Sequence, residues 1–297
     1  MSSHSVHVPV MYREVLQHLQ LCEGLVVMDG TVGAGGHSQL IRKQLGDSGR
    51  LIGFDRDPMM LSFAAEKLPE SNVTLVHSSY VDAERVLSEL GVSGVDRVLL
   101  DLGLSSDQLS DRQRGFGFDA GGPLDMRFDI RHGRSAAEFL RTADESEITD
   151  VLTRFGEEPH ARQIARQICR SRGQQPLETS EDLQELVRSV GSVGGRGSSF
   201  RNPATRVFQA LRIAVNHELD HVEQMFTDVL PRILNPGGIV VVLTFHSLED
   251  RIVKSAFKGS PEWQVLTKTP IEATPAEIRL NPRSRSAKLR AAKRKLP

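Results

Sequence analysis

The segment "MDGTVGAGGHS", residues 28–38, contains four glycines at the point where an apolar run ends. It follows an apolar run at 25–27 and precedes a segment with a helical pattern. Glycines let a chain turn sharply and bring its amides close to a ligand, and parallel α/β sheets bind nucleotide cofactors at such turns. The stretch therefore predicts a cofactor loop, and the rest of the sequence must indicate which cofactor it binds.

The loop matches the dinucleotide fingerprint G-x-G-x-x-G only in part. Gly33 and Gly35 satisfy its first half, whereas Ser38 stands at the position of the third glycine. This mismatch counts against a nicotinamide-dependent oxidoreductase, the alternative from a different enzyme class. The glycines alone leave several cofactors open.

Short apolar runs alternate with helical patterns through the first hundred residues, at 25–29, 50–55, 73–77 and 96–101. This alternation predicts βαβ units and a parallel sheet. The runs end on polar residues, namely Asp29, Asp55, His77 and Asp101. Ligands of open α/β sheets bind at the carboxyl ends of the strands, so Asp55 is a candidate acceptor for ribose hydroxyls. A helix N-cap or a surface acid is the alternative interpretation of Asp55.

A second cue is the turn "LNPGG" at 234–238, directly before the β-branched run at 239–247. Such a turn commonly introduces the fifth strand of S-adenosylmethionine-dependent methyltransferases and is less typical of nicotinamide enzymes. Together with Asp55 it favours a methyl donor as the cofactor.

The strand alternation stops after Asp101, and helical patterns dominate until the run at 239–247. This break predicts an inserted helical domain. Within it, Thr179 and Asp182 have the spacing of a capping box, and Asn202 with Pro203 predicts the start of a further helix. We expect a first core part at 1–104, the insertion at 105–207, and a second core part with a basic C-terminal tail at 208–297.

The composition is that of an ordinary globular protein with 297 residues and 39% hydrophobic content. Cys22 and Cys169 lie far apart without CxxC spacing, so neither a disulfide framework nor a thiolate zinc site is indicated. No metal-ligand spacing is evident among the histidines and acids, and no metal is expected. Without a signal peptide or an apolar run of about 18 residues, a cytoplasmic protein with no membrane partner is expected.

The net charge of −1 hides a basic C-terminal end. After Glu277 no acid occurs, and the basic residues there are Arg279, Arg283, Arg285, Lys288, Arg290, Lys293, Arg294 and Lys295. Such a tail could contact phosphates of a nucleic acid. A solvated tail that keeps the protein in solution is the alternative.

Long sequence blocks, in order over nearly the whole chain, carry the most specific signal. They are "HVPVMYREVL", "DGTVGAGGHS", "FDRDP", "LLDLGLSSDQLSDRQRGFGFDAGGPLDMRFD", "FGEEPHARQIARQI", "NPATRVFQALRIAVNHEL", "FHSLEDRIVK" and "NPRSRSAKLR". With these blocks the sequence resembles the RsmH (MraW) family of bacterial 16S rRNA cytosine-N4 methyltransferases. The resemblance implies an α/β fold: a class I (Rossmann-like) S-adenosylmethionine-dependent methyltransferase core with an inserted all-helical substrate domain. Its partner would be 16S rRNA or the small ribosomal subunit, with no DNA expected and with monomer or homodimer left open.

The resemblance also implies roles for individual residues. Gly35, Gly36 and His37 would line the methionine and sulfonium part of S-adenosyl-L-methionine, and Asp55 would accept from the ribose hydroxyls. The full set of implied cofactor-binding residues is Gly33, Gly35, Gly36, His37, Asp55, Tyr80, Asp101 and Gln108, with Tyr80 near the adenine.

The amine of cytosine is a weak nucleophile because its lone pair is delocalised into the ring, so the enzyme must position and polarise it. Asp101 and the following residues, with the hydroxyl of Ser105 or Ser106, are our candidates for that task. The serines could instead only cap the next turn. The Pro-Pro motif of many DNA amino-methyltransferases is missing after Asp101, which counts against a DNA cytosine-N4 or adenine-N6 enzyme.

Substrate-binding candidates are Asn216, His246, Arg283 and Arg285. For Asn216 the alternative is a helix-capping role, and for His246 it is a satisfied histidine at a strand end. A non-catalytic RNA-binding ribosome-assembly factor is the remaining alternative for the whole protein.

Overall fold

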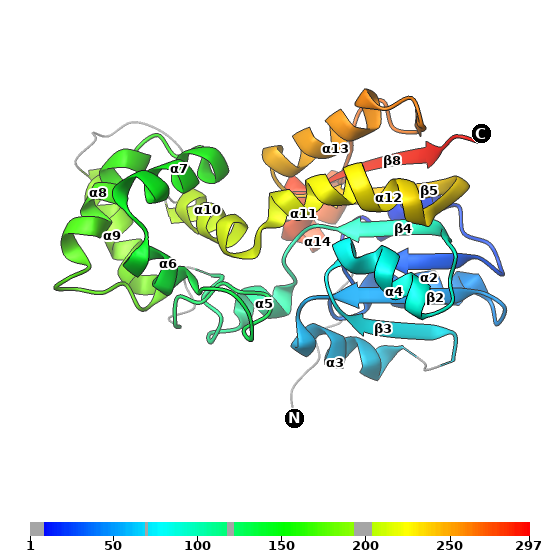
Figure 1. Ribbon diagram of the computed structural model, residues 1–297, viewed down its shortest axis with the longest axis horizontal. Coiled ribbons are helices and arrows are strands. Elements are labelled where there is room, and N and C mark those ends of the chain that lie inside the picture. The colour runs from blue at the N-terminus through cyan, green and yellow to red at the C-terminus, as the bar shows by residue number, and fades with distance from the viewer. Residues whose placement is uncertain (1–8, 69–70, 118–121, 193–203) are drawn as a thin grey trace. The chain divides into compact units, whose positions relative to one another are not determined.

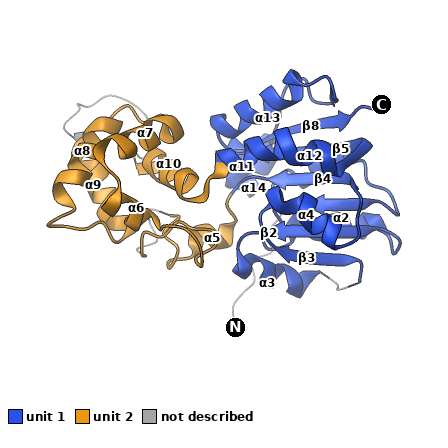
Figure 2. Ribbon diagram, in the orientation of Figure 1, with its two compact units in different colours: residues 1–103, 219–297 blue, residues 104–218 orange. Residues whose placement is uncertain are grey.

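The computed structural model describes residues 9–68, 71–117, 122–192 and 204–297 (Figure 1). Its contacts divide the chain into two compact units, which Figure 2 shows in blue and orange. The first unit comprises Met1–Gly103 and Leu219–Pro297, and the second comprises Leu104–Glu218. Each unit is considered by itself.

The first unit is built on an eight-stranded sheet with the order β3-β2-β1-β4-β5-β8-β6, and β7 pairs with β8 (Figure 1). The strands are β1 (Val26–Asp29), β2 (Arg50–Asp55), β3 (Val73–His77), β4 (Val95–Asp101), β5 (Leu234–Thr244), β6 (Trp263–Val265), β7 (Ile271–Glu272) and β8 (Lys288–Arg294). The first five pair in parallel, as the sequence predicted, and β8 is antiparallel to its neighbours. The order reverses between β1 and β4, which makes this point of the sheet the expected ligand site.

Both faces of the sheet are buried, which explains why its strands are apolar runs rather than alternating ones. Successive residues of one strand point to opposite faces. Val27 of β1 packs in one hydrophobic cluster with Leu51 and Leu99, whereas the next residue, Met28, packs in another cluster with Ile52.

The helices of the first unit connect these strands. They are α1 (Tyr12–Leu19), α2 (Gly36–Leu45), α3 (Pro58–Lys67), α4 (Ala83–Glu89), α11 (Glu218–Gln224), α12 (Leu230–Ile233), α13 (Ser247–Gly259) and α14 (Pro275–Leu280). Three short turns add to them: η1 (Tyr80–Asp82), η2 (Met225–Val229) and η3 (Pro282–Ser286).

The basic C-terminal end is part of the sheet, which corrects the expectation of a solvated or diffuse phosphate-binding tail. Strand β8 lies between β5 and β6, and its Leu289 and Ala291 are fully buried. Arg290 is 5% exposed, and its Nε donates to Oδ1 of Asp250 at 2.6 Å. This stretch of basic and apolar residues therefore forms a sheet strand, with the guanidinium of Arg290 paired inside the protein.

The second unit is helical, as expected for the insertion. Its helices are α5 (Ser106–Ser110), α6 (Ala136–Thr142), α7 (Glu145–Gly156), α8 (Ala161–Ser171), α9 (Ser180–Ser192) and α10 (Ala204–Asn216). They enclose a hydrophobic core that includes Leu152, Ile164 and Leu211. The unit ends at Glu218 rather than near 207 because α10 contributes Leu211 and its neighbours to this core.

Helix starts in the second unit follow local sequence signals. The Thr179 hydroxyl accepts from the Asp182 N–H at 3.2 Å, and the Asp182 carboxylate accepts from the Thr179 N–H at 2.8 Å, so the predicted capping box is confirmed. The predicted helix start at Asn202 and Pro203 lies outside the described residues.

Within the described ranges, no helix is both long and apolar enough to cross a membrane.

A candidate cofactor site at the carboxyl ends of the strands

Three carboxylates end three adjacent strands of the first unit. Asp29 ends β1, Asp55 ends β2 and Asp101 ends β4, and β1 lies between the other two. The carboxyl ends of parallel strands meet at one edge of the sheet, and here this edge coincides with the reversal of strand order. The arrangement places negative charge where a cofactor of an open α/β sheet binds.

The glycine loop between β1 and α2 adopts backbone angles that favour glycine. Gly33 has φ 53° and Gly35 has φ 82°, and Gly35 is the N-cap of α2. A Cβ at Gly35 would lie 3.2 Å from the backbone of Ala64, whereas a Cβ at Gly33 would meet nothing within 4 Å. Gly33 therefore leaves open space beside the loop, and Gly35 allows close packing behind it.

The carboxylate of Asp55 is tied to this loop. It accepts from the Gly33 N–H at 2.7 Å and from the Asp57 N–H at 2.8 Å. Burial raises the pKa of Asp55 to about 7, although these two hydrogen bonds act in the opposite direction. A ligand that donates hydroxyl groups to Asp55 would favour its ionised form.

His37 and Asp101 supply buried polar atoms that the described chain leaves unsatisfied. Nε2 of His37 lies 3.6 Å from Oδ2 of Asp101. Both ring nitrogens of His37 and Oδ1 of Asp101 are buried without a hydrogen-bond partner in the described residues. The Asp101 N–H donates to the Thr31 hydroxyl at 2.6 Å, which fixes the carboxylate next to the loop. Since buried polar atoms without partners are uncommon, these atoms fit a polar ligand.

Tyr80 lies just after β3, and its ring is 8% exposed. It packs edge-on against the ring of His221, with centroids 6.4 Å apart, and Nη1 of Arg56 lies 3.4 Å from Nδ1 of His221. A Cβ at Gly30 would lie 2.5 Å from Cδ2 of Leu100 and 3.1 Å from Cβ of Tyr80, so the glycine allows these two residues to pack closely. The sequence offered no signal for His221, because it comes from α11, far along the chain.

Buried Asp29 lies at the same edge, at the end of β1. Burial raises its pKa, and a hydrogen bond from Ser38 opposes this shift. The Ser38 hydroxyl donates to Oδ2 of Asp29 at 2.6 Å, and the Thr31 N–H donates to Oδ1 at 3.1 Å. The serine in place of the third glycine thus tethers α2 to the end of β1.

The serines after Asp101 begin a helix of the second unit. The Ser105 hydroxyl accepts from the Gln108 N–H, and Oε1 of Gln108 accepts from the Ser105 N–H, each at 3.0 Å. Ser106 is the first residue of α5. Ser105 therefore caps α5, as the alternative interpretation of this serine stated, and Gln108 completes the capping box. Contacts of these residues with cofactor or cytosine remain predictions.

Asn216 is 1% exposed, which differs from the expectation of a substrate-binding amide. Its Oδ1 accepts from the Phe128 N–H at 2.8 Å, and its Nδ2 donates to the carbonyls of Met126 at 2.7 Å and Arg212 at 2.9 Å. Met126 has a left-handed backbone with φ 62°. The amide therefore holds an irregular loop against α10 and is not placed to bind a base edge.

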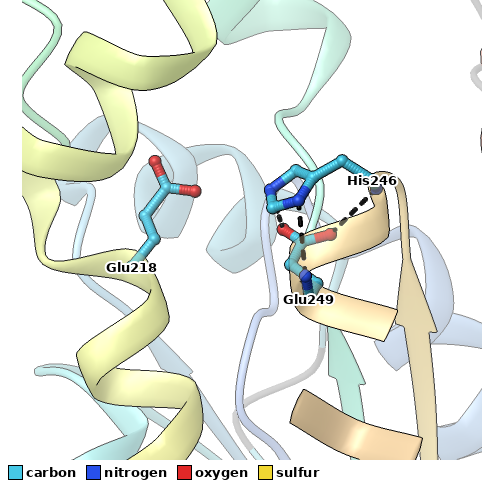
Figure 3. Close-up of side chains that lie close together, drawn as sticks. All are labelled: Glu218, His246 and Glu249. Carbon is cyan, nitrogen blue, oxygen red and sulfur yellow. Dashed lines mark hydrogen bonds and ion pairs between the residues drawn. The ribbon is translucent and has the colours of Figure 1, made fainter. Parts of the chain in front are cut away.

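His246 is the N-cap of α13 directly after β5 (Figure 3). Its Nδ1 accepts from the Glu249 N–H at 3.4 Å, and its Nε2 lies 3.0 Å from Oε1 of Glu249. Oε2 of Glu249 accepts from the Phe245 N–H at 2.8 Å. The position at the strand end agrees with the prediction, and the contacts with Glu249 fix the ring. The alternative of a satisfied histidine is met at Nδ1 only, because Nε2 of His246 is buried without a hydrogen-bond partner in the described residues.

Arg283 and Arg285 lie in η3, which precedes β8. The side chain of Arg285 is exposed, whereas Arg283 is half-buried. Between them, buried Ser284 donates its hydroxyl proton to the Asn281 carbonyl at 2.7 Å and fixes the turn. Arg285 is therefore accessible to a polyanion, and its role in substrate binding remains a prediction.

Known proteins similar to this chain cover nearly its whole length. The MraW methylase family matches residues 4–295. "Ribosomal RNA small subunit methyltransferase H" of Sorangium cellulosum is 46% identical over 293 residues, which are 97% of this chain and 90% of the relative. The protein of the same name from Elusimicrobium minutum is 44% identical over 97% of this chain and 98% of its own. Among solved structures, Aeropyrum pernix fibrillarin in complex with S-adenosyl-L-methionine aligns over 95% of this chain and 75% of its own, with 10% identity and a TM-score of 0.42.

Proposed function

Because the chain belongs to the MraW methylase family, we propose that it transfers the methyl group of S-adenosyl-L-methionine to the exocyclic N4 of a cytidine in small-subunit rRNA. The observation that carries this proposal is the 46% identity, over 97% of the chain, to a protein named for methylation of small-subunit rRNA. We place the cytidine in the decoding region of 16S rRNA on the strength of the family resemblance.

The cofactor site of the first unit fits S-adenosyl-L-methionine, whose sulfonium supplies an electrophilic methyl group. Asp55 would accept from the two ribose hydroxyls. Tyr80 would pack near the adenine, and the loop from Gly33 to His37 would border the methionine part. The open space beside Gly33 and the unsatisfied atoms of His37 and Asp101 support this assignment.

The chain's own task in the reaction is to position a poor nucleophile. Oδ1 of Asp101 is a buried acceptor, and the bond from the Asp101 N–H to Thr31 holds the residue at the end of β4. An acceptor at an amine N–H favours the pyramidal nitrogen that attacks the methyl group, and alignment adds to the rate. We assign this positioning to Asp101, aided by the backbone of residues 102–104 and the hydroxyls of Ser105 or Ser106.

His246, Arg283 and Arg285 complete the proposal as contacts for the RNA. His246 follows β5 at the same edge of the sheet as Asp101, because β5 pairs with β4 in parallel. A ring fixed by Glu249 needs no reorganisation before it binds a substrate group. Arg285 offers an exposed guanidinium to a phosphate.

A parallel assay tests the function. Labelled S-adenosyl-L-methionine is incubated with the protein and naked 16S rRNA, purified small subunits or DNA, and the labelled nucleoside is identified. Label in N4-methylcytidine from either RNA sample supports the proposal. Label in DNA would favour the DNA amino-methyltransferase, and cofactor binding without transfer to any acceptor would favour the non-catalytic RNA-binding factor.

A further inference from the structure

Helix α8 (Ala161–Ser171) has two sharply different faces. One face packs into the core of the second unit and consists of Ala161, Ile164, Ala165 and Ile168. The opposite face carries Arg162, Arg166 and Arg170, all exposed and each four residues from the next. In Figure 2 this helix lies beside α7 and α9 of the orange unit.

The spacing of the three arginines places like charges next to each other on one face of the helix. Like charges at i and i+4 repel each other and lower the stability of the helix. Nε of Arg166 lies 3.5 Å from Oε1 of Glu145, with both side chains over two-fifths exposed, so this pair offsets little of the repulsion. Arg162 and Arg170 have no ion pair or hydrogen bond with the described part of the chain.

Other exposed arginines of the second unit do pair with nearby acids. Four pairs illustrate this: Arg131 with Asp129, Arg134 with Glu147, Arg141 with Glu138, and Arg154 with Asp150. Arg188 of α9 and Arg206 of α10 are single exposed arginines without a described partner. On α8, by contrast, two arginines without a described partner, Arg162 and Arg170, lie on the same face of one helix, on either side of Arg166.

We propose that this row, Arg162, Arg166 and Arg170, binds the sugar-phosphate backbone of the rRNA substrate. The inference rests on the proposed function, since it deepens the description of how that substrate is held. A helix rises 1.5 Å per residue, so successive guanidinium groups are spaced by about 6 Å along the axis, comparable with the step between phosphates of one strand. A planar guanidinium binds phosphate oxygens in a bidentate manner.

The neighbouring side chains on α8 suit the same partner. Gln163 and Gln167 are exposed beside the arginine row. Their amides can donate to phosphate oxygens or exchange hydrogen bonds with the 2′-hydroxyl of RNA. The exposed face thus combines charge with polar groups and lacks acids between Ala161 and Ser171.

The test compares two variants with equal loss of charge in the full-length protein. The first carries R162Q, R166Q and R170Q, and the control carries R134Q, R141Q and R154Q, which remove paired arginines. Binding to a 16S rRNA fragment is measured over a range of salt concentrations. Loss of three phosphate contacts should make the fall of log K with log[salt] less steep, by about 2 in the magnitude of the slope. It should also weaken binding by about tenfold or more at low salt. The control should keep the wild-type slope.

Two further measurements separate RNA binding from folding and from catalysis. In methyl transfer the α8 variant should show a raised KM for RNA, with kcat at saturation and the affinity for S-adenosyl-L-methionine unchanged. The charge-retaining variant R162K, R166K and R170K should keep most of the salt dependence. If the glutamine variant does not fold, R162Q and R170Q alone should each lower the slope by about 0.7.

A slope equal to that of wild type, or the same decrease in both glutamine variants, would overturn the inference and leave α8 as a solvated face. That result differs from failure of the proposed function itself. In the latter case the wild-type protein would form no N4-methylcytidine in rRNA, whatever the α8 variants bind.

Discussion

The Ser38 hydroxyl donates a hydrogen bond to Oδ2 of Asp29 at 2.6 Å, and both residues are fully buried. Ser38 occupies the position at which a dinucleotide-binding loop has its third glycine. There a glycine permits close packing of helix and strand, whereas here a side chain links α2 to the carboxyl end of β1. The departure from the fingerprint thus supplies a polar contact beneath the cofactor loop.

Ser38→Ala should destabilise the protein by about 1–3 kcal/mol, because it leaves a buried carboxylate with one partner fewer. The pKa of Asp29 is already raised by burial, and loss of the Ser38 bond should raise it further. A raised pKa favours the folded state at low pH and costs stability as pH rises, so the defect should grow from acid to neutral pH. Urea unfolding at several pH values measures it.

Ser62→Ala is the matched control for Ser38→Ala. The Ser62 hydroxyl also bonds within the chain, to the Met59 carbonyl at 2.7 Å, but it is exposed to solvent. Its loss should change the free energy of unfolding by less than about 0.5 kcal/mol. Equal changes in the free energy of unfolding for the two substitutions would show that the hydrogen bond from Ser38 to Asp29 contributes no more stability than an exposed hydrogen bond.

Affinity for S-adenosyl-L-methionine should depend on pH through Asp55. Burial raises its pKa to about 7 in the free protein. At a pH below the ordinary Asp pKa of 3.8, the raised pKa of Asp55 contributes its full stability to the fold, and this contribution is lost as the pH rises through 7. Since ribose hydroxyls donate to the ionised carboxylate, affinity should fall about tenfold per pH unit below 7 and level off above it.

Isothermal titration calorimetry between pH 5.5 and 8.5 measures this dependence. Asp55→Asn should bind more weakly and lose the pH dependence, because an amide does not titrate in this range. A wild-type affinity that stays constant from pH 5.5 to 8.5 would contradict the assignment of Asp55 to the ribose.

Asn216→Ala should act on stability and not on RNA recognition. Three backbone groups of the chain pair with the buried amide, so its removal should cost about 2 kcal/mol or more of unfolding free energy. KM for rRNA, measured per folded molecule, should not change. Gln174→Ala, which removes an exposed amide, is the control and should leave the midpoint of unfolding in place.

Truncation after Asn281 should prevent folding, because it removes β8 from between β5 and β6 and exposes buried Leu289. Arg285→Gln tests RNA binding without that damage, since Arg285 is exposed. We expect unchanged thermal stability and a slope of log K against log[salt] for RNA binding that is smaller in magnitude by about 0.7. A stable, folded truncated protein would contradict the place of β8 in the sheet.

Local patterns in the sequence were sufficient to predict the parallel sheet and the polar residues at the carboxyl ends of its strands. Apolar runs that end on an acid show both the strand and the place where it stops, so Asp55 and Asp101 could be located without a structure. The capping box of Thr179 and Asp182 was predictable for the same reason, since its partners are three residues apart.

Contacts between distant parts of the chain could not be predicted in this way. Asn216 bonds to residues of a loop ninety positions earlier, and no periodicity reports such a pairing. Strand β8 mixes basic residues with alanines and one leucine, a composition that is also typical of a disordered tail, and only its pairing with β5 shows that it is a strand. His221 meets Tyr80 only through the fold of the first unit.

The most direct test of the central claim is nucleoside analysis of small-subunit rRNA after incubation with S-adenosyl-L-methionine carrying a labelled methyl group. Wild-type protein should place the label in N4-methylcytidine. Asp101→Asn should bind the RNA with unchanged salt dependence and reduce single-turnover transfer by about a hundredfold, because an amide oxygen is a weaker acceptor than a carboxylate oxygen and the amide nitrogen accepts no hydrogen bond. Label in any other nucleoside, or full transfer by Asp101→Asn, would contradict the proposed function or the role of Asp101, respectively.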